Sequence, residues 1–123
     1  MDRTRAPSPP RPPRAWDATA LRRDAAHFRG TGGVSEENCG LGFSPAFFDA
    51  ETGSVHRSSF ADGRPAPFHL LDGLPPELIA RRDGRGRVTA VKGSLVSGFL
   101  RRGRFYTREQ AAAAAMRSAA MPA

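Results

Sequence analysis

Glycine and proline punctuate most of this chain and limit the length of its regular elements. There are 13 glycines and 11 prolines among 123 residues. Glycine favours turn conformations with positive φ, and proline fixes φ and lacks a backbone donor. From Val34 to Tyr106 the segments between turn residues are as long as short strands, which predicts a series of hairpins.

Three hairpins are expected between residues 43 and 106. The first turn opens with Asp49 and contains Gly53, which tolerates a positive φ. Pro45 lies in the strand before this turn, and because proline cannot donate to a ladder, we expect an edge strand there. The hairpins pair 43–48 with 55–60, 78–82 with 87–92, and 95–100 with 105–106.

Two helices are expected at the ends of this region. Asp17 is a suitable N-cap for a helix that runs to about Phe28. Thr107 and Gln110 have the spacing of a capping box, and the alanines that follow favour a second helix through Met116.

The expected fold class is α+β, a small antiparallel sheet of hairpins closed by a C-terminal helix. We divide the chain into a disordered Pro/Arg-rich tail (1–15), a short helix with a glycine hinge (16–33), a β-rich domain with the C-terminal helix (34–116) and a frayed end (117–123). The expected core consists of Phe43, Phe47, Val55, Phe60, Leu71, Leu74, Ile79, Val88, Val91, Val96, Phe99 and Phe105.

The net charge of +7 is unevenly distributed along the chain. Residues 34–75 are acidic, whereas the segments on either side are basic, with arginine supplying all the positive residues except Lys92. Codon usage of a GC-rich genome would raise arginine content without any functional reason, but it does not explain why positive and negative residues lie in different segments. The segregation therefore favours a basic surface.

The chain has no apolar run long enough to span a membrane and no signal segment. Its single cysteine, Cys39, fits a reducing compartment. We therefore expect a cytoplasmic protein without a membrane partner.

Cys39 and the three histidines are the candidates for an enzymatic or metal site. A cysteine nucleophile would need His27, His56 or His69 as its base. The neighbouring acids at 36–37 would raise the pKa of the thiol, and no pair of these residues has the close spacing of zinc ligands. We predict no catalytic residue, metal or cofactor, and keep a Cys/His enzyme centred on Cys39 as an alternative.

Gly30-Thr31-Gly32-Gly33 is a candidate for a backbone nest that binds phosphate. It lacks the lysine and hydroxyl of a Walker loop. A turn or hinge is the interpretation we prefer.

The C-terminal block contains the candidate nucleic-acid site. Small β-modules bind single strands by combining arginines, which neutralise phosphates, with exposed rings on which bases stack. A second basic turn, between residues 81 and 87, would extend the same surface. The candidate site residues are Arg101, Arg102, Arg104, Tyr106 and Arg108.

The segment Gly98–Ala111 matches the pattern G-F-x-x-x-G-R-F-x-x-R-x-x-A at every fixed position. In this it resembles a segment of small uncharacterised bacterial and phage-associated proteins. The resemblance implies a bacterial origin and carries no activity.

Together these features predict a non-enzymatic binding or accessory module. A protein is the expected partner, because opposite charges and open strand edges suit protein contact. Nucleic-acid binding through the hairpin-helix unit 98–111 is the alternative.

Overall fold

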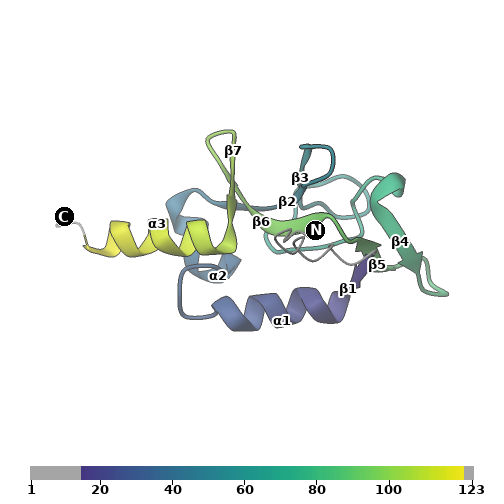
Figure 1. The fold of residues 1–123 in the computed structure, drawn as a ribbon, viewed down its shortest axis with the longest axis horizontal. Coiled ribbons are helices and arrows are strands. Elements are labelled where there is room, and N and C mark those ends of the chain that lie inside the picture. Colours follow the sequence, from purple (N-terminus) through teal and green to yellow (C-terminus); the bar gives the residue numbers. More distant parts are fainter. Residues whose placement is uncertain (1–14, 121–123) are drawn as a thin grey trace, which may run out of the picture.

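The computed structural model describes residues 15–120. Its helices are α1 (Ala18–Phe28), α2 (Ser35–Asn38) and α3 (Arg108–Ala120), with short 3-10 turns at Cys39–Leu41 and Pro76–Leu78. Figure 1 shows the strands, which are β1 (Ala15–Asp17), β2 (Ser44–Asp49), β3 (Val55–Arg57), β4 (Ile79–Arg82), β5 (Val88–Lys92), β6 (Leu95–Arg101) and β7 (Arg104–Thr107).

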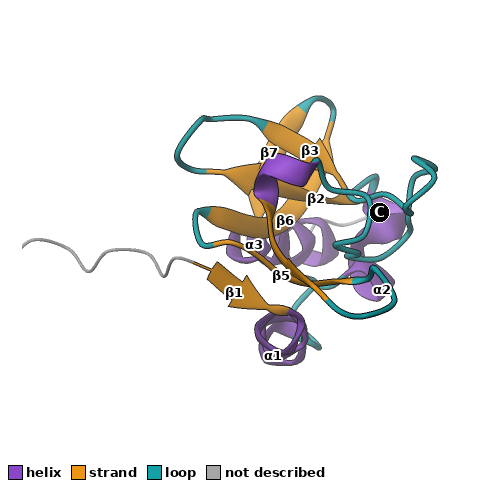
Figure 2. Ribbon diagram, turned by 90° about the vertical axis from the view of Figure 1, so that its right-hand side faces the viewer, coloured by secondary structure: helices purple, strands orange, loops and turns teal. Residues whose placement is uncertain are grey.

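The strands form two antiparallel sheets, in the orders β1-β5-β4 and β3-β2-β6-β7. Gly93 and Ser94 join β5 to β6, so the chain passes from one sheet into the other at this point. The α+β class and the three expected hairpins are confirmed, and Figure 2 shows α1, α2 and α3 on the lower side of β2, β3 and β7.

The prediction that Pro45 marks an edge strand is wrong, because β2 is paired on both sides. Pro45 lies at the last rung of the ladder with β3, where its carbonyl accepts from the Ser58 N–H at 2.9 Å. Because proline has no N–H to donate to the Ser58 carbonyl, this carbonyl accepts instead from the Ala66 N–H at 3.0 Å. The missing donor therefore costs no hydrogen bond, and the proline is tolerated inside the sheet.

Residues 16–33 pack on the same core as the rest of the chain. Asp17 caps α1, accepting from the Ala20 N–H at 3.0 Å, as predicted. Trp16 lies in β1, opposite Val91 of β5, and its Nε1–H donates to the Leu95 carbonyl at 2.9 Å. The predicted tail, 1–15, lies outside the described residues except for its last residue, which begins β1.

The capping box at the start of α3 is confirmed. The Gln110 side chain accepts from the Thr107 N–H at 2.9 Å, and the Thr107 hydroxyl accepts from the Gln110 N–H at 3.1 Å. Ala111 and Ala114 lie on the buried side of this helix, against Phe99. The helix continues to residue 120, past the predicted start of fraying at 117, and residues 121–123 lie outside the described part.

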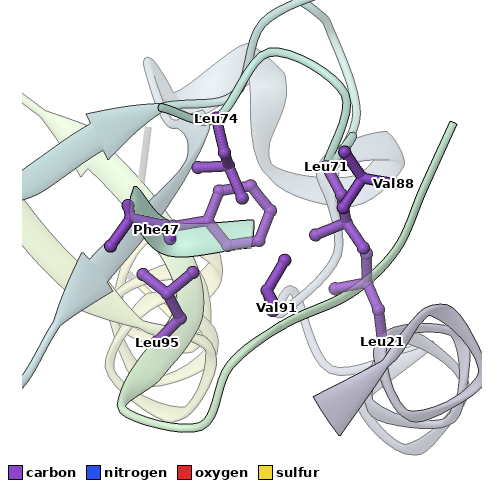
Figure 3. Packing of buried hydrophobic residues seen from close by; sticks show 8 residues of the cluster. Leu21, Phe47, Leu71, Leu74, Val88, Val91 and Leu95 are labelled. Atoms are coloured by element: carbon purple, nitrogen blue, oxygen red, sulfur yellow. The ribbon is translucent and has the colours of Figure 1, made fainter. Parts of the chain in front are cut away.

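The main core lies between the two sheets and α1 (Figure 3). Over residues 15–120, seven of the twelve residues predicted to be in the core are buried. Val55 and Val96 are 40% and 38% exposed, so their placement in the core was wrong. In β6 the inward side chains are Leu95, Ser97 and Phe99, and the intervening Val96 must face the other way.

Cross-strand pairing defines the opposite side of the four-stranded sheet. Residues that pair directly across neighbouring strands share one face. We call this side the outer face; it is made by Ser44, Ala46, Phe48, Val55, Arg57, Val96, Gly98, Leu100, Phe105 and Thr107.

A buried carboxylate ties the β2–β3 turn to the junction of the sheets. Asp49 is fully buried at the end of β2. Hydrogen bonds, the strongest from Ser94, hold the pKa of Asp49 well below its ordinary value. Its donors are Ser94 Oγ at 2.6 Å, Lys92 Nζ at 3.0 Å, the Glu51 N–H at 3.0 Å and Thr52 Oγ1 at 3.1 Å.

We expect Asp49→Asn to lower the free energy of unfolding by about 2 kcal/mol, because an amide is a weaker acceptor and its NH2 group faces other donors. Urea denaturation at neutral pH measures the change. Glu51→Gln is the control, since Glu51 also contacts Lys92 at 3.0 Å but is exposed, and should cost less than about 0.5 kcal/mol. Equal losses in the two variants would contradict this role for Asp49.

Candidate functional site

The tight turn between β6 and β7 presents consecutive basic residues at one end of the sheet. Arg101 and Arg104 are direct cross-strand partners, and Arg102 and Gly103 form the turn. Both turn residues have positive φ, 53° and 78°, as a two-residue turn of type I′ requires. Arginine is an unusual choice for the first of these positions, because a side chain in the left-handed region is strained.

Tyr106 lies at the centre of this basic group. Its ring packs edge-on against Phe43, with centroids 5.0 Å apart. The Arg101 guanidinium lies 4.4 Å from the Phe43 ring centre and 5.1 Å from that of Tyr106, and Arg104 lies 5.4 Å from the Tyr106 ring centre. These distances fit cation–π contacts, so Tyr106 is half-buried and held in one orientation.

The electrostatic environment of the group is positive. A hydrogen bond from Arg101, followed by the charges of Arg101, Arg104 and Arg102, lowers the pKa of the Tyr106 hydroxyl. Among the carboxylates of residues 15–120, none forms an ion pair with these three arginines. Their charge is therefore left for solvent or a ligand to neutralise.

Arg108 does not belong to this surface. It is 4% exposed, and its guanidinium lies over the Phe99 ring at 5.7 Å. It donates from Nε to Ser97 Oγ at 3.2 Å and from Nη1 to the Gly33 carbonyl at 2.8 Å. Burial lowers the pKa of Arg108, although the charges of Asp24 and Glu36 oppose the shift. Arg108, the fifth predicted site residue, therefore makes its contacts inside the protein.

His69 is the third partner of the Arg108 guanidinium. Nη2 of Arg108 lies 3.3 Å from Nδ1 of His69, and because a guanidinium can only donate, Nδ1 is the acceptor. The proton is then on Nε2, which donates to the Gly98 carbonyl at 2.7 Å. Burial of the ring, followed by the charge of Arg108, lowers the pKa of His69 from 6.5 to about 3.

The second basic turn lies elsewhere on the molecule. It connects β4 to β5, with Arg81 and Arg82 on β4 and Arg85 in the turn itself. Figure 1 shows this turn at the right-hand end, well separated from the β6–β7 turn at upper left. The two turns therefore do not form one continuous surface.

The structure does not bring Cys39 together with a histidine. Cys39 is exposed on a shallow groove with Phe43, Pro45 and Arg57. His56 contacts the Ser54 hydroxyl at 2.9 Å, and both ring nitrogens of His69 are hydrogen-bonded, to Arg108 and to the Gly98 carbonyl. Within residues 15–120, no three His, Cys, Asp or Glu side chains are grouped to hold a metal ion.

The glycine-rich nest at 30–33 is filled by the chain itself. The Glu37 carboxylate accepts from the Gly30 N–H at 2.7 Å and from the Gly32 N–H at 2.9 Å. These bonds lower the pKa of Glu37, the bond from Gly32 most. Gly33 packs closely against Phe28 and the Arg108 carbonyl, so the segment is a packed turn.

Comparisons with protein-family models, curated proteins and solved structures find no match to this chain. The resemblance of residues 98–111 therefore stays a prediction. Within residues 15–120, no helix combines the length and apolar character needed to cross a bilayer.

We expect Arg102→Gly to raise the free energy of unfolding by about 0.5–1 kcal/mol, because glycine relieves the left-handed strain at this position. Thermal and urea denaturation measure the change. Arg102→Ala removes the same charge but keeps the strained backbone, so it should bring no gain. If Arg102→Ala also raised the free energy of unfolding, the loss of charge would be the cause instead.

We expect protonation of His69 to destabilise the fold in mild acid. As the pH falls below about 6.5 the unfolded chain binds a proton at His69, whereas the folded chain does so only near pH 3. Stability should therefore fall with pH, by up to about 1.4 kcal/mol per pH unit from this group. Denaturation between pH 6.5 and 5, where most carboxylates remain charged, measures the slope.

His69→Gln should flatten this slope, because glutamine does not titrate. His27→Gln is the matched control, since it makes the same substitution at an exposed position of α1. An unchanged slope in His69→Gln would rule out this origin of the acid sensitivity.

Proposed function

We propose that the protein is a non-catalytic binding module and that its partner at the β6–β7 turn is nucleic acid. The observation that supports this is the group of Arg101, Arg102 and Arg104 around Tyr106, without an ion-pair partner among the described residues. Sequence reasoning favoured a protein partner. An unneutralised cluster of arginines beside a partly exposed ring favours a polyanion with bases.

The arginines have different roles in this proposal. Arg102 and Arg104 are exposed and are the phosphate contacts. Arg101 is held between Phe43 and Tyr106, so its main role is to position the tyrosine and to add charge. Arg108 supports the site from beneath, by holding α3 against β6.

A protein partner is the second candidate. It is favoured by the exposed Val55 and Val96, which flank Phe48 on the outer face, since grouped exposed apolar side chains are typical of protein contacts. Self-association that is insensitive to salt would be its signature.

We further propose a bacterial origin and a cytoplasmic location. The first rests on the resemblance of residues 98–111. The second rests on the single, exposed Cys39, which suits a reducing compartment.

We expect the protein to bind a labelled oligodeoxythymidine with an affinity that falls steeply between about 50 and 200 mM salt. Removing one phosphate contact should reduce the slope of log K against log salt by about 0.7. Arg102→Gly and Arg104→Ala should each produce this reduction and weaken binding. Fluorescence anisotropy over a salt series measures both quantities.

Arg102→Gly is the decisive variant, because it removes a charge while relieving backbone strain, so weaker binding cannot be attributed to unfolding. Arg85→Ala is the matched control, since it removes one charge from the other basic turn. If it weakens binding as much as Arg102→Gly does, binding follows net charge and the proposed site is wrong.

A further inference from the structure

The outer face carries two phenylalanines whose rings stack on each other. Phe48 of β2 and Phe105 of β7 have centroids 5.4 Å apart and planes inclined by 27°. These strands flank β6, so one ring must reach across it. A Cβ at Gly98 of β6 would overlap the Phe105 ring, and only glycine leaves room for this crossing. The two rings therefore form a stacked pair on the outer face of the sheet, which we call the aromatic floor.

No helix of the described residues covers this floor. The helices α1, α2 and α3 lie below β2, β3 and β7 in both views (Figures 1 and 2). Val55 and Val96, which pair with Phe48 from its two neighbouring strands, are 40% and 38% exposed. The two phenylalanines are themselves partly exposed, so the floor is accessible to a flat ligand.

The charges around the floor are positive. Arg57 is the charged strand residue of the outer face and is exposed, and the exposed Arg102 lies in the turn where β6 ends. Arg104 packs over Tyr106 on the opposite face. At the opposite end, Glu51 is ion-paired with Lys92 at 3.0 Å, and Lys92 also pairs with the buried Asp49 at 3.0 Å. A ligand that crosses the floor therefore meets uncompensated cations and an apolar, aromatic surface.

We propose that the outer face is a stacking platform for unpaired bases, and that the ligand at the β6–β7 turn is a single-stranded nucleic acid. This inference rests on the proposed nucleic-acid binding and specifies its ligand. A single strand can lay its bases on Phe48 and Phe105 while its phosphates reach Arg57 and Arg102. In a duplex the bases are stacked on one another and cannot use the aromatic floor.

The test compares an oligodeoxythymidine of about twelve nucleotides with a duplex of the same length, in fluorescence anisotropy at low salt. The single strand should bind about tenfold more tightly or better. Phe105→Leu should weaken its binding about tenfold and leave the salt slope unchanged, because stacking is lost and the phosphate contacts remain. Phe68→Leu is the control, since Phe68 is 45% exposed but lies outside the outer face.

Photocrosslinking of the unmodified protein avoids any effect of these substitutions on folding. An oligonucleotide that carries 5-bromodeoxyuridine should crosslink to peptides containing β2, β6 or β7. Crosslinks confined to other segments would overturn the platform.

The outcomes separate the two proposals. Equal affinity for single strand and duplex, unaffected by Phe105→Leu but lost in Arg102→Gly, would overturn the platform and leave nucleic-acid binding in place. No binding of either oligonucleotide would overturn both. Self-association abolished by Val96→Lys would then assign the outer face to a second copy of the chain.

Discussion

The arrangement of this fold depends on a buried guanidinium. Arg108, at the start of α3, donates to Ser97 of β6, to the Gly33 carbonyl after α1 and to His69 in the loop between β3 and β4. These three acceptors are far apart in the sequence and none is a carboxylate. Because a buried charge is costly unless its hydrogen bonds are satisfied, the segments that supply the acceptors must lie together around the helix terminus. Arg108 thus determines how α3 lies on the sheet.

The candidate binding surface follows from this placement. With α3 held against β6, the helix and Phe99 bury one side of the sheet and Phe43 fills the space beneath Tyr106. Arg101 is fixed by the two rings, while Arg102 and Arg104 stay exposed. The sheet is therefore packed on one side by helices and open on the other. At its β6–β7 end the exposed Arg102 of the turn lies close in sequence to the partly exposed Phe105.

Features governed by neighbouring residues were predicted well from the sequence. Asp17 caps α1, Thr107 and Gln110 form the capping box of α3, and all three hairpins close at the expected turns. The failures concern long-range packing. Pro45 was assigned to an edge because the sequence does not reveal that Ala66 would satisfy the Ser58 carbonyl. Predicting both Val96 and Phe99 as core overlooked the alternation of a strand, which places them on opposite faces.

The sequence by itself determined where the chain turns, where its helices begin and that its C-terminal part is basic. These properties depend on backbone preferences and hydrogen bonds within a few residues. Only the tertiary structure decided which arginine is buried and that Phe105 crosses Gly98 to reach Phe48. The same residue types would serve either a surface or an interior. The choice between them is made by the free energy of contacts between segments distant in sequence, which local patterns do not encode.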